Sequence, residues 1–222
     1  MTIVWILIAI AVQLVVSFLA YQYVTHRTDG VLDKKHFFAL RFEWVPLIVI
    51  GIAFLLSIGI LLYGLLVEEN RIIRAVMNAV VFIWLALLGY VDIKEKIIPN
   101  PLIGIGLGCW LVLVLIDIFV GGTPWYSVLV YSLIGGLGIG GVLLIIAMIT
   151  KSALGMGDVK MFTVLGLLYG LTDTYSILLF SIVVMGLVSV GLLIAKKVTM
   201  KTAIPMAPFV AGGFLLSILA GM

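Results

Sequence analysis

Long apolar runs recur along the chain, and they limit what it can fold into more than any other feature. A helix needs about 20 apolar residues to cross a bilayer, and the 222-residue chain offers runs of that length repeatedly. Hydrophobic residues make up 64% of the sequence and charged residues only 10%, which leaves too little polar surface for a soluble domain. A membrane β-barrel would alternate polar and apolar residues, whereas these runs are apolar on every side. We therefore expect an all-α, polytopic membrane helical bundle.

Polar interruptions divide the chain into about eight spans. We expect these spans near residues 2–22, 45–67, 73–91, 100–120, 127–150, 159–172, 174–195 and 204–221. The first span lacks a preceding basic segment and a small-residue cleavage site, so we predict a retained transmembrane helix and not a signal peptide. No linker rich in Pro, Gly or Ser separates two halves, and no internal repeat is evident. Residues 1–222 are therefore predicted to form a single integral membrane domain.

The basic residues are distributed unevenly between the connections, which predicts the orientation. Eleven of the thirteen lie on one side: Arg27, Lys34, Lys35, Arg41, Lys94, Lys96, Lys151, Lys160, Lys196, Lys197 and Lys201. By the positive-inside rule this side is cytoplasmic, and both termini are outside. The net charge of +3 therefore indicates contact with anionic lipid head groups and not with nucleic acid. The sizeable cytoplasmic loop near 23–43 mixes basic and apolar residues, which predicts a short interfacial helix or, alternatively, a solvated connection.

Acidic residues are costly inside a membrane, so each of the ten is a candidate for function. Most of them fall in connections or near the outer boundary, where ordinary surface roles explain them. Asp92 and Asp158 differ, because two spans lie between them and an even number of crossings returns the chain to the same face. Both are therefore predicted to lie at the cytoplasmic membrane boundary. Taken singly, Asp158 is also explained as a helix cap, and Asp92 as an interfacial acid offset by neighbouring lysines.

Glycine and proline stand next to the two aspartates. Gly155 and Gly157 precede Asp158, and glycine allows another segment to approach the backbone closely. After Asp92, the turn at 98–100 interrupts the chain before the next span, where proline is tolerated because the first helical N–H needs no partner within the helix. The local sequence therefore allows both aspartates to sit at helix ends.

At these residues the sequence resembles the type IV prepilin peptidase family, whose members are Gly-x-Gly-Asp intramembrane aspartyl proteases. The family pattern is an aspartate followed by Ile-Pro-Asn and, two spans later, a Gly-x-Gly-Asp-x-Lys block. The matching residues here are Asp92, Ile98, Pro99 and Asn100, then Gly155, Met156, Gly157, Asp158, Val159 and Lys160. A third match, at 204–209 followed by Gly212 and Gly213, is similar to the family's proline-containing final span. The resemblance covers about residues 45–222.

The resemblance implies that Asp92 and Asp158 form a catalytic dyad. The supporting motif residues are Pro99, Asn100, Gly155, Gly157 and Lys160. One carboxylate would act as general base on a water, and the other, protonated, would polarise the scissile carbonyl, with no metal or cofactor required. The implied substrates are prepilin-like precursors with a short basic leader, a glycine at the cleavage point and a hydrophobic helix beyond it. Weaker candidates for attracting the basic leader are Asp29, Asp33, Glu43 and Glu95.

Cysteine usage departs from that of larger family members. Many bacterial members carry two CxxC pairs in the large cytoplasmic loop and also methylate the new N-terminus, whereas this chain has one cysteine, Cys109, inside an apolar run. The sequence therefore resembles the compact members without a cysteine-rich zinc domain, and we do not expect methyl transfer. From the residues alone, two other classes stay open: a small proton-coupled transporter and a non-catalytic platform for pilus assembly. The sequence determines neither the oligomeric state nor whether a pilus, secretion or competence system is served.

Overall fold

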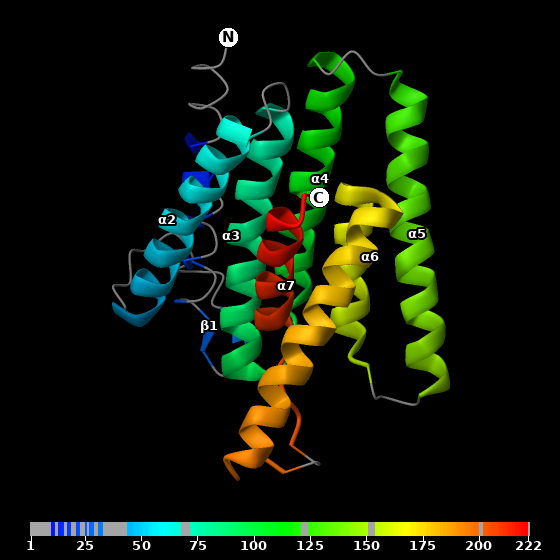
Figure 1. The fold of residues 1–222 in the computed structure, drawn as a ribbon. Helices are drawn as coiled ribbons and strands as arrows, with labels where there is room; N and C mark the ends of the chain where they lie inside the picture. The colour runs from blue at the N-terminus through cyan, green and yellow to red at the C-terminus, as the bar shows by residue number, and fades with distance from the viewer. Residues whose placement is uncertain are drawn as a thin grey trace. The chain divides into compact units, whose positions relative to one another are not determined.

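A computed structural model describes residues 44–67, 72–120, 124–150, 154–199 and 202–221, together with part of the segment 10–32. The elements in these ranges are β1 (Arg27–Thr28), β2 (Val31–Leu32), α2 (Trp44–Val67), α3 (Ile72–Glu95), α4 (Asn100–Val120), α5 (Trp125–Ile149), α6 (Met156–Ile194) and α7 (Ala207–Leu219). The described residues between 10 and 25 are helical as well. Helices α2 to α6 are long and apolar enough to cross a membrane, and α7 is a shorter apolar helix. The predicted all-α membrane bundle is therefore confirmed (Figure 1).

Helix α6 accounts for two of the predicted spans. The spans at 159–172 and 174–195 correspond to two limbs of α6, residues 156–169 and 171–194, which meet at a bend at Gly170. Gly170 has φ 70° and ψ −170°, a combination that is nearly restricted to glycine. Figure 1 shows the chain reversing its direction there, from the yellow first limb to the orange second limb. The other described helices agree with their predicted spans to within a few residues.

Only part of the predicted loop at 23–43 is described. Arg27 pairs with Leu32 and Thr28 with Val31 in a short antiparallel ladder. These four residues are extended and not helical, because paired strands require extended backbone. The predicted interfacial helix is therefore wrong for residues 27–28 and 31–32, and residues 33–43 lie outside the described ranges.

Contacts divide the chain into two compact units, Met1–Val91 and Asp92–Met222. In the first unit, α2 and α3 approach closely at one point, where a Cβ atom on Gly64 would lie 2.7 Å from the Cβ of Ala75. Helix α3 is buried along most of its length, whereas α2 exposes most of its side chains. The prediction of a single domain is not decided by this division and stays a prediction.

In the second unit, α6 packs mainly against α5 and α7. The α5–α6 contact depends on glycine, because a Cβ on Gly136 would lie 2.6 Å from the Leu167 side chain, and one on Gly166 would lie 2.9 Å from the Cα of Gly136. Small residues allow helix backbones to approach closely where lipid supplies no hydrophobic driving force. Glycine therefore sets the distance between α5 and the first limb of α6.

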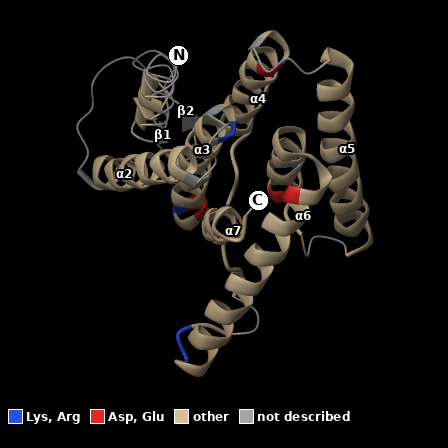
Figure 2. Ribbon diagram, turned by 45° about the horizontal axis from the view of Figure 1, so that its top comes forward, with Lys and Arg blue, Asp and Glu red and all other residues tan. Residues whose placement is uncertain are grey.

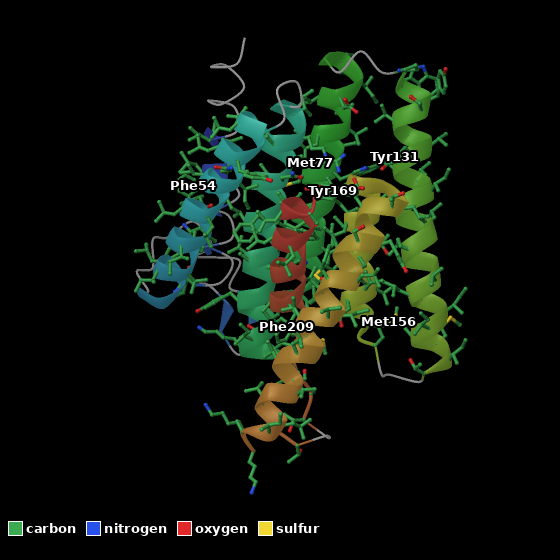
Figure 3. All side chains as sticks on the ribbon, viewed as in Figure 1. Phe54, Met77, Tyr131, Met156, Tyr169 and Phe209 are labelled. Atoms are coloured by element: carbon green, nitrogen blue, oxygen red, sulfur yellow. The ribbon has the colours of Figure 1, made fainter. Side chains whose placement is uncertain are left out.

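The bend in α6 is closed by side chains from both neighbouring helices. Tyr131 of α5 donates its hydroxyl proton to the carbonyl of Tyr169 over 3.0 Å (Figure 3). A break in a helix deprives carbonyls of their usual partners, and the Tyr131 hydroxyl supplies one replacement. The buried Tyr169 ring in turn meets Phe214 of α7 edge-on, with ring centroids 5.5 Å apart. These contacts hold the bend next to Gly170 in one conformation.

In the described helices, charged residues lie near the helix ends or close to the bend in α6. Figure 2 shows most of the ribbon as uncharged, with acidic and basic positions near helix ends and turns. The described lysines at 94, 96, 160, 196 and 197 are exposed and flank the end of α3 or the two ends of α6. Charge at the ends and apolar surface between them are typical of membrane-spanning helices. The chain is a multi-pass membrane protein.

Candidate active site

Asp92 and Asp158 come together at one end of the second unit. Asp92 lies in the last turn of α3, and Asp158 lies in the first turn of α6. The sequence predicted that the span ends at Asp92, whereas α3 continues for about one turn to Glu95. The two carboxylates are close enough to interact electrostatically. Asp92 is buried and Asp158 is partly exposed. Molecules outside the protein can therefore reach the pair from the side of Asp158.

The start of α7 holds the Asp92 carboxylate. The backbone N–H of Ala207 donates to Oδ2 of Asp92 over 3.0 Å, and both residues are buried. A carboxylate at a helix N-terminus gains from such an N–H donor and from the positive end of the helix dipole. Helix α7 is therefore part of the site, although it is far from Asp92 in the sequence.

Asp158 is held by the start of its own helix. Gly155 is the N-cap residue of α6, and the Asp158 carboxylate lies close to its backbone. A Cβ on Gly155 would lie 2.9 Å from Oδ2 of Asp158, so glycine leaves room for the carboxylate to fold back. The N-cap of α6 is Gly155 and not Asp158, which lies three residues later in the first turn with Asp92 as its acidic neighbour.

The supporting motif residues connect the start of α4 to the start of α6. Lys160 donates to Oδ1 of Asn100 over 2.8 Å. A Cβ on Gly157 would lie 2.8 Å from the Cβ of Ile98, so the backbone of Gly157 packs closely against the Ile98 side chain. Pro99, between Ile98 and Asn100, is buried. The two sequence motifs therefore form one interlocked structure beside the aspartates.

We expect the Gly157→Ala substitution to lower the free energy of unfolding by about 1–3 kcal/mol, because the added methyl group overpacks the contact with Ile98. Gly108→Ala in α4 is the matched control, since a Cβ there meets nothing within 4 Å. Thermal unfolding of both purified variants in detergent, followed by circular dichroism, measures the difference. Equal unfolding temperatures for the two variants would contradict the close contact at Gly157.

The acids predicted to attract a leader are described only in part. Asp29, Asp33 and Glu43 lie outside the described residues. Glu95 is exposed and is the last residue of α3, one turn after Asp92. Its role in leader binding stays a prediction. Within the described ranges, no group of three or more His, Cys, Asp and Glu side chains could hold a metal ion.

The hydrogen bond from α7 is the part of the site that sequence reasoning missed. The segment at 204–209 was recognised as a motif, but no role followed from it. A backbone N–H has no signature in a sequence, because every residue except proline carries one. The available signal was Pro208, since proline near the first turn of a helix marks where unpaired N–H groups begin.

The structure is thus a helical membrane protein with two neighbouring aspartates at one end of its second unit. The sequence model of the type IV leader peptidase family matches residues 79–190, a range that contains both aspartates and the motifs around them. The chain belongs to the type IV leader peptidase family, which confirms the resemblance seen in its motifs.

One relative adds detail to this assignment. The chain is 31% identical over 144 residues to the prepilin leader peptidase/N-methyltransferase of Bacillus subtilis (strain 168). The match covers 64% of this chain and 55% of the relative, so the chain spans about half the length of that protein. No solved structure matches the chain.

Proposed function

We propose that this protein is an aspartic endopeptidase that removes the leader peptide from type IV prepilin-like precursors at the cytoplasmic membrane face. The observation that carries the proposal is the approach of the Asp92 and Asp158 carboxylates, which come from separate helices and lie within the family's matched range. The substrate class is that named for the Bacillus subtilis relative. Asp92 and Asp158 are the proposed catalytic residues.

In the proposed reaction, the two carboxylates act on one water molecule. Two neighbouring carboxylates share a proton, because like charges at short distance repel. The unprotonated one takes a proton from water as the water oxygen attacks the scissile carbonyl, and the protonated one donates to the carbonyl oxygen. The resulting tetrahedral intermediate breaks its C–N bond as the leaving nitrogen takes a proton from the protonated carboxyl group, while one hydroxyl of the intermediate returns its proton to the other carboxylate. Water is thereby added across the peptide bond, and the dyad returns to its starting state.

The hydrogen bonds around the dyad support this mechanism. Ala207 donates to Asp92, so this carboxylate is oriented by a backbone group. Groups that are oriented before the substrate arrives lower the barrier, because they do not have to reorganise during the reaction. The proposed roles of Lys160 and Asn100 are to hold the start of α6 against the start of α4 through their hydrogen bond.

The exposed lysines support a cytoplasmic location for the dyad. Lys94 and Lys96 follow Asp92, and Lys160 follows Asp158. By the positive-inside rule this end of the second unit faces the cytoplasm, and both termini lie outside. The same lysines suit anionic head groups. A basic leader in the cytoplasm and a hydrophobic helix in the bilayer would meet at this depth, where the exposed Glu95 carboxylate would attract the leader.

Reconstituted protein tests the proposal. Mixed in liposomes with a purified prepilin-like precursor, the protein is expected to release the leader, seen as a shift on a gel and as a new N-terminus by mass spectrometry. The Bacillus subtilis relative is the positive control, and a precursor with its cleavage-point glycine replaced by a bulky residue is the negative control. The mass of the product also tests whether a methyl group is added. An intact precursor that the relative cleaves would count against the proposal.

A further inference from the structure

We propose that the start of α7 is a positioning element of the dyad, in which the Ala207 N–H holds the Asp92 carboxylate in its reactive orientation. This inference rests on the proposed function and extends it. It concerns a part of the chain beyond residue 190, where the match to the family model ends.

The N–H groups at the start of α7 have to find partners outside the helical ladder. Phe209 donates to the carbonyl of Met206, and Pro208 has no N–H to satisfy. The Met206 side chain provides no cap. The N–H of Ala207, the first residue of the helix, is left, and it donates to Asp92. Asp92 therefore caps α7 from another helix, in addition to its place in the dyad.

Burial makes this bond difficult to replace. Asp92 exposes 6% of its surface and Ala207 exposes 0%. Water has poor access to either group, so loss of the N–H would leave a buried acceptor with one partner fewer. The orientation of Asp92 is therefore sensitive to the position of α7.

The position of α7 is fixed by α6, the helix that carries Asp158. A Cβ on Gly213 of α7 would lie 2.5 Å from the backbone nitrogen of Ser181, so the two helices touch there. Phe214 of α7 also meets Tyr169 of α6. Figure 3 shows Phe209 and Met156, near the starts of α7 and α6, at the same end of the second unit. One continuous set of contacts thus runs from α6 through α7 to the Asp92 carboxylate.

The Ala207→Pro variant removes the donor at the helix position where proline is best tolerated. Ala207→Gly keeps the N–H and is the matched control. With a purified prepilin-like precursor as the probe, we expect Ala207→Pro to lower kcat about tenfold or more and to leave KM nearly unchanged, because a misplaced catalytic group slows the reaction without weakening substrate binding. Ala207→Gly is expected to retain most of the activity. An unchanged kcat in folded Ala207→Pro protein would overturn the proposal.

A second change covers the case in which Ala207→Pro does not fold. Replacing Ala207 by lactic acid, through ligation of a synthetic C-terminal segment, converts this one amide into an ester and keeps the methyl side chain. The same selective loss of kcat is expected. Full activity of the ester-containing protein would overturn the proposal regardless of how the proline variant behaves.

A measurement independent of cleavage separates this inference from the proposed function. Amide hydrogen exchange at residue 207 is expected to accelerate in Asp92→Ala protein and to stay near the original rate in Asp92→Asn protein, whose side-chain oxygen still accepts a hydrogen bond. Asp158→Ala is the control and should leave this amide unchanged. Unaltered exchange in Asp92→Ala protein would overturn the positioning role. The expected exchange pattern in a protein that cleaves no precursor would overturn the proposed function alone.

Discussion

Proteins carrying Asp92→Asn or Asp158→Asn are expected to fold normally and to release the leader about 10²–10⁴-fold more slowly than the unsubstituted protein. Each change preserves the shape of the side chain but removes its ability to exchange a proton with water or the substrate. In the Asp92→Asn protein, the side-chain oxygen can still accept from Ala207, so the start of α7 keeps a cap. Initial rates of leader release, measured on purified proteins with matching circular dichroism spectra, test this expectation.

Two other acids provide matched controls for the dyad. Asp117→Asn changes an aspartate near the opposite end of α4, and we expect no change in rate. Glu95→Gln changes an exposed acid one turn from Asp92, and we expect a higher KM with an unchanged kcat if this side chain attracts the leader. Leader release by Asp158→Asn protein at the rate of the Asp117→Asn control would contradict a catalytic role for Asp158.

The Gly170→Ala substitution is expected to cost at least about 3 kcal/mol of unfolding free energy, the largest stability effect of any single methyl group considered in this chain. Alanine strongly disfavours the backbone conformation at this position, which has φ 70° and ψ −170°. The added methyl group would also overlap the ring of Tyr131. Both penalties act at the bend, so the two limbs of α6 should lose their relative orientation.

Gly191→Ala, in the second limb of the same helix, is the matched control. A Cβ there meets nothing within 4 Å, and alanine is favoured over glycine in a helix by about 1 kcal/mol. Thermal or detergent-induced unfolding, followed by circular dichroism, should therefore separate the two variants clearly. A Gly170→Ala protein as stable as the Gly191→Ala protein would contradict the bend.

The Tyr131→Phe substitution removes the hydrogen bond to the Tyr169 carbonyl. It is expected to lower the free energy of unfolding by about 1 kcal/mol in the same measurement.

Most helices were predictable because lipid offers the backbone no hydrogen-bond partners. A chain in a bilayer must pair its N–H and C=O groups internally, so the length of an apolar run translates directly into a helix. The predicted spans agree with α2, α4 and α5 to within a few residues. The break between the two limbs of α6 was expected at residue 173, in a polar turn, whereas it lies at Gly170, the nearby residue that adopts a left-handed backbone conformation.

Helix ends and short connections were less predictable. Helix α3 continues past Asp92 to Glu95 because the intervening residues tolerate a helix, and the left-handed conformation of Lys96 (φ 54°) follows its end. The paired residues at 27–28 and 31–32 gave no strand signal, since each strand is too short to show an alternating pattern. At the end of α3 and in the two short strands, only a few residues are involved. Their conformational preferences are too small for the sequence pattern to predict the local structure.

Hydropathy and residue spacing alone establish the membrane-spanning helices and single out Asp92 and Asp158, because a carboxylate next to lipid is costly enough to be conspicuous in any sequence. Only the packed structure reveals which groups surround these aspartates. The bond from Ala207, the contact of Gly157 with Ile98 and the pairing of Lys160 with Asn100 join segments that are far apart in the chain. These contacts depend on backbone atoms, on missing side chains and on distances between helices, and such quantities exist only after the helices have packed.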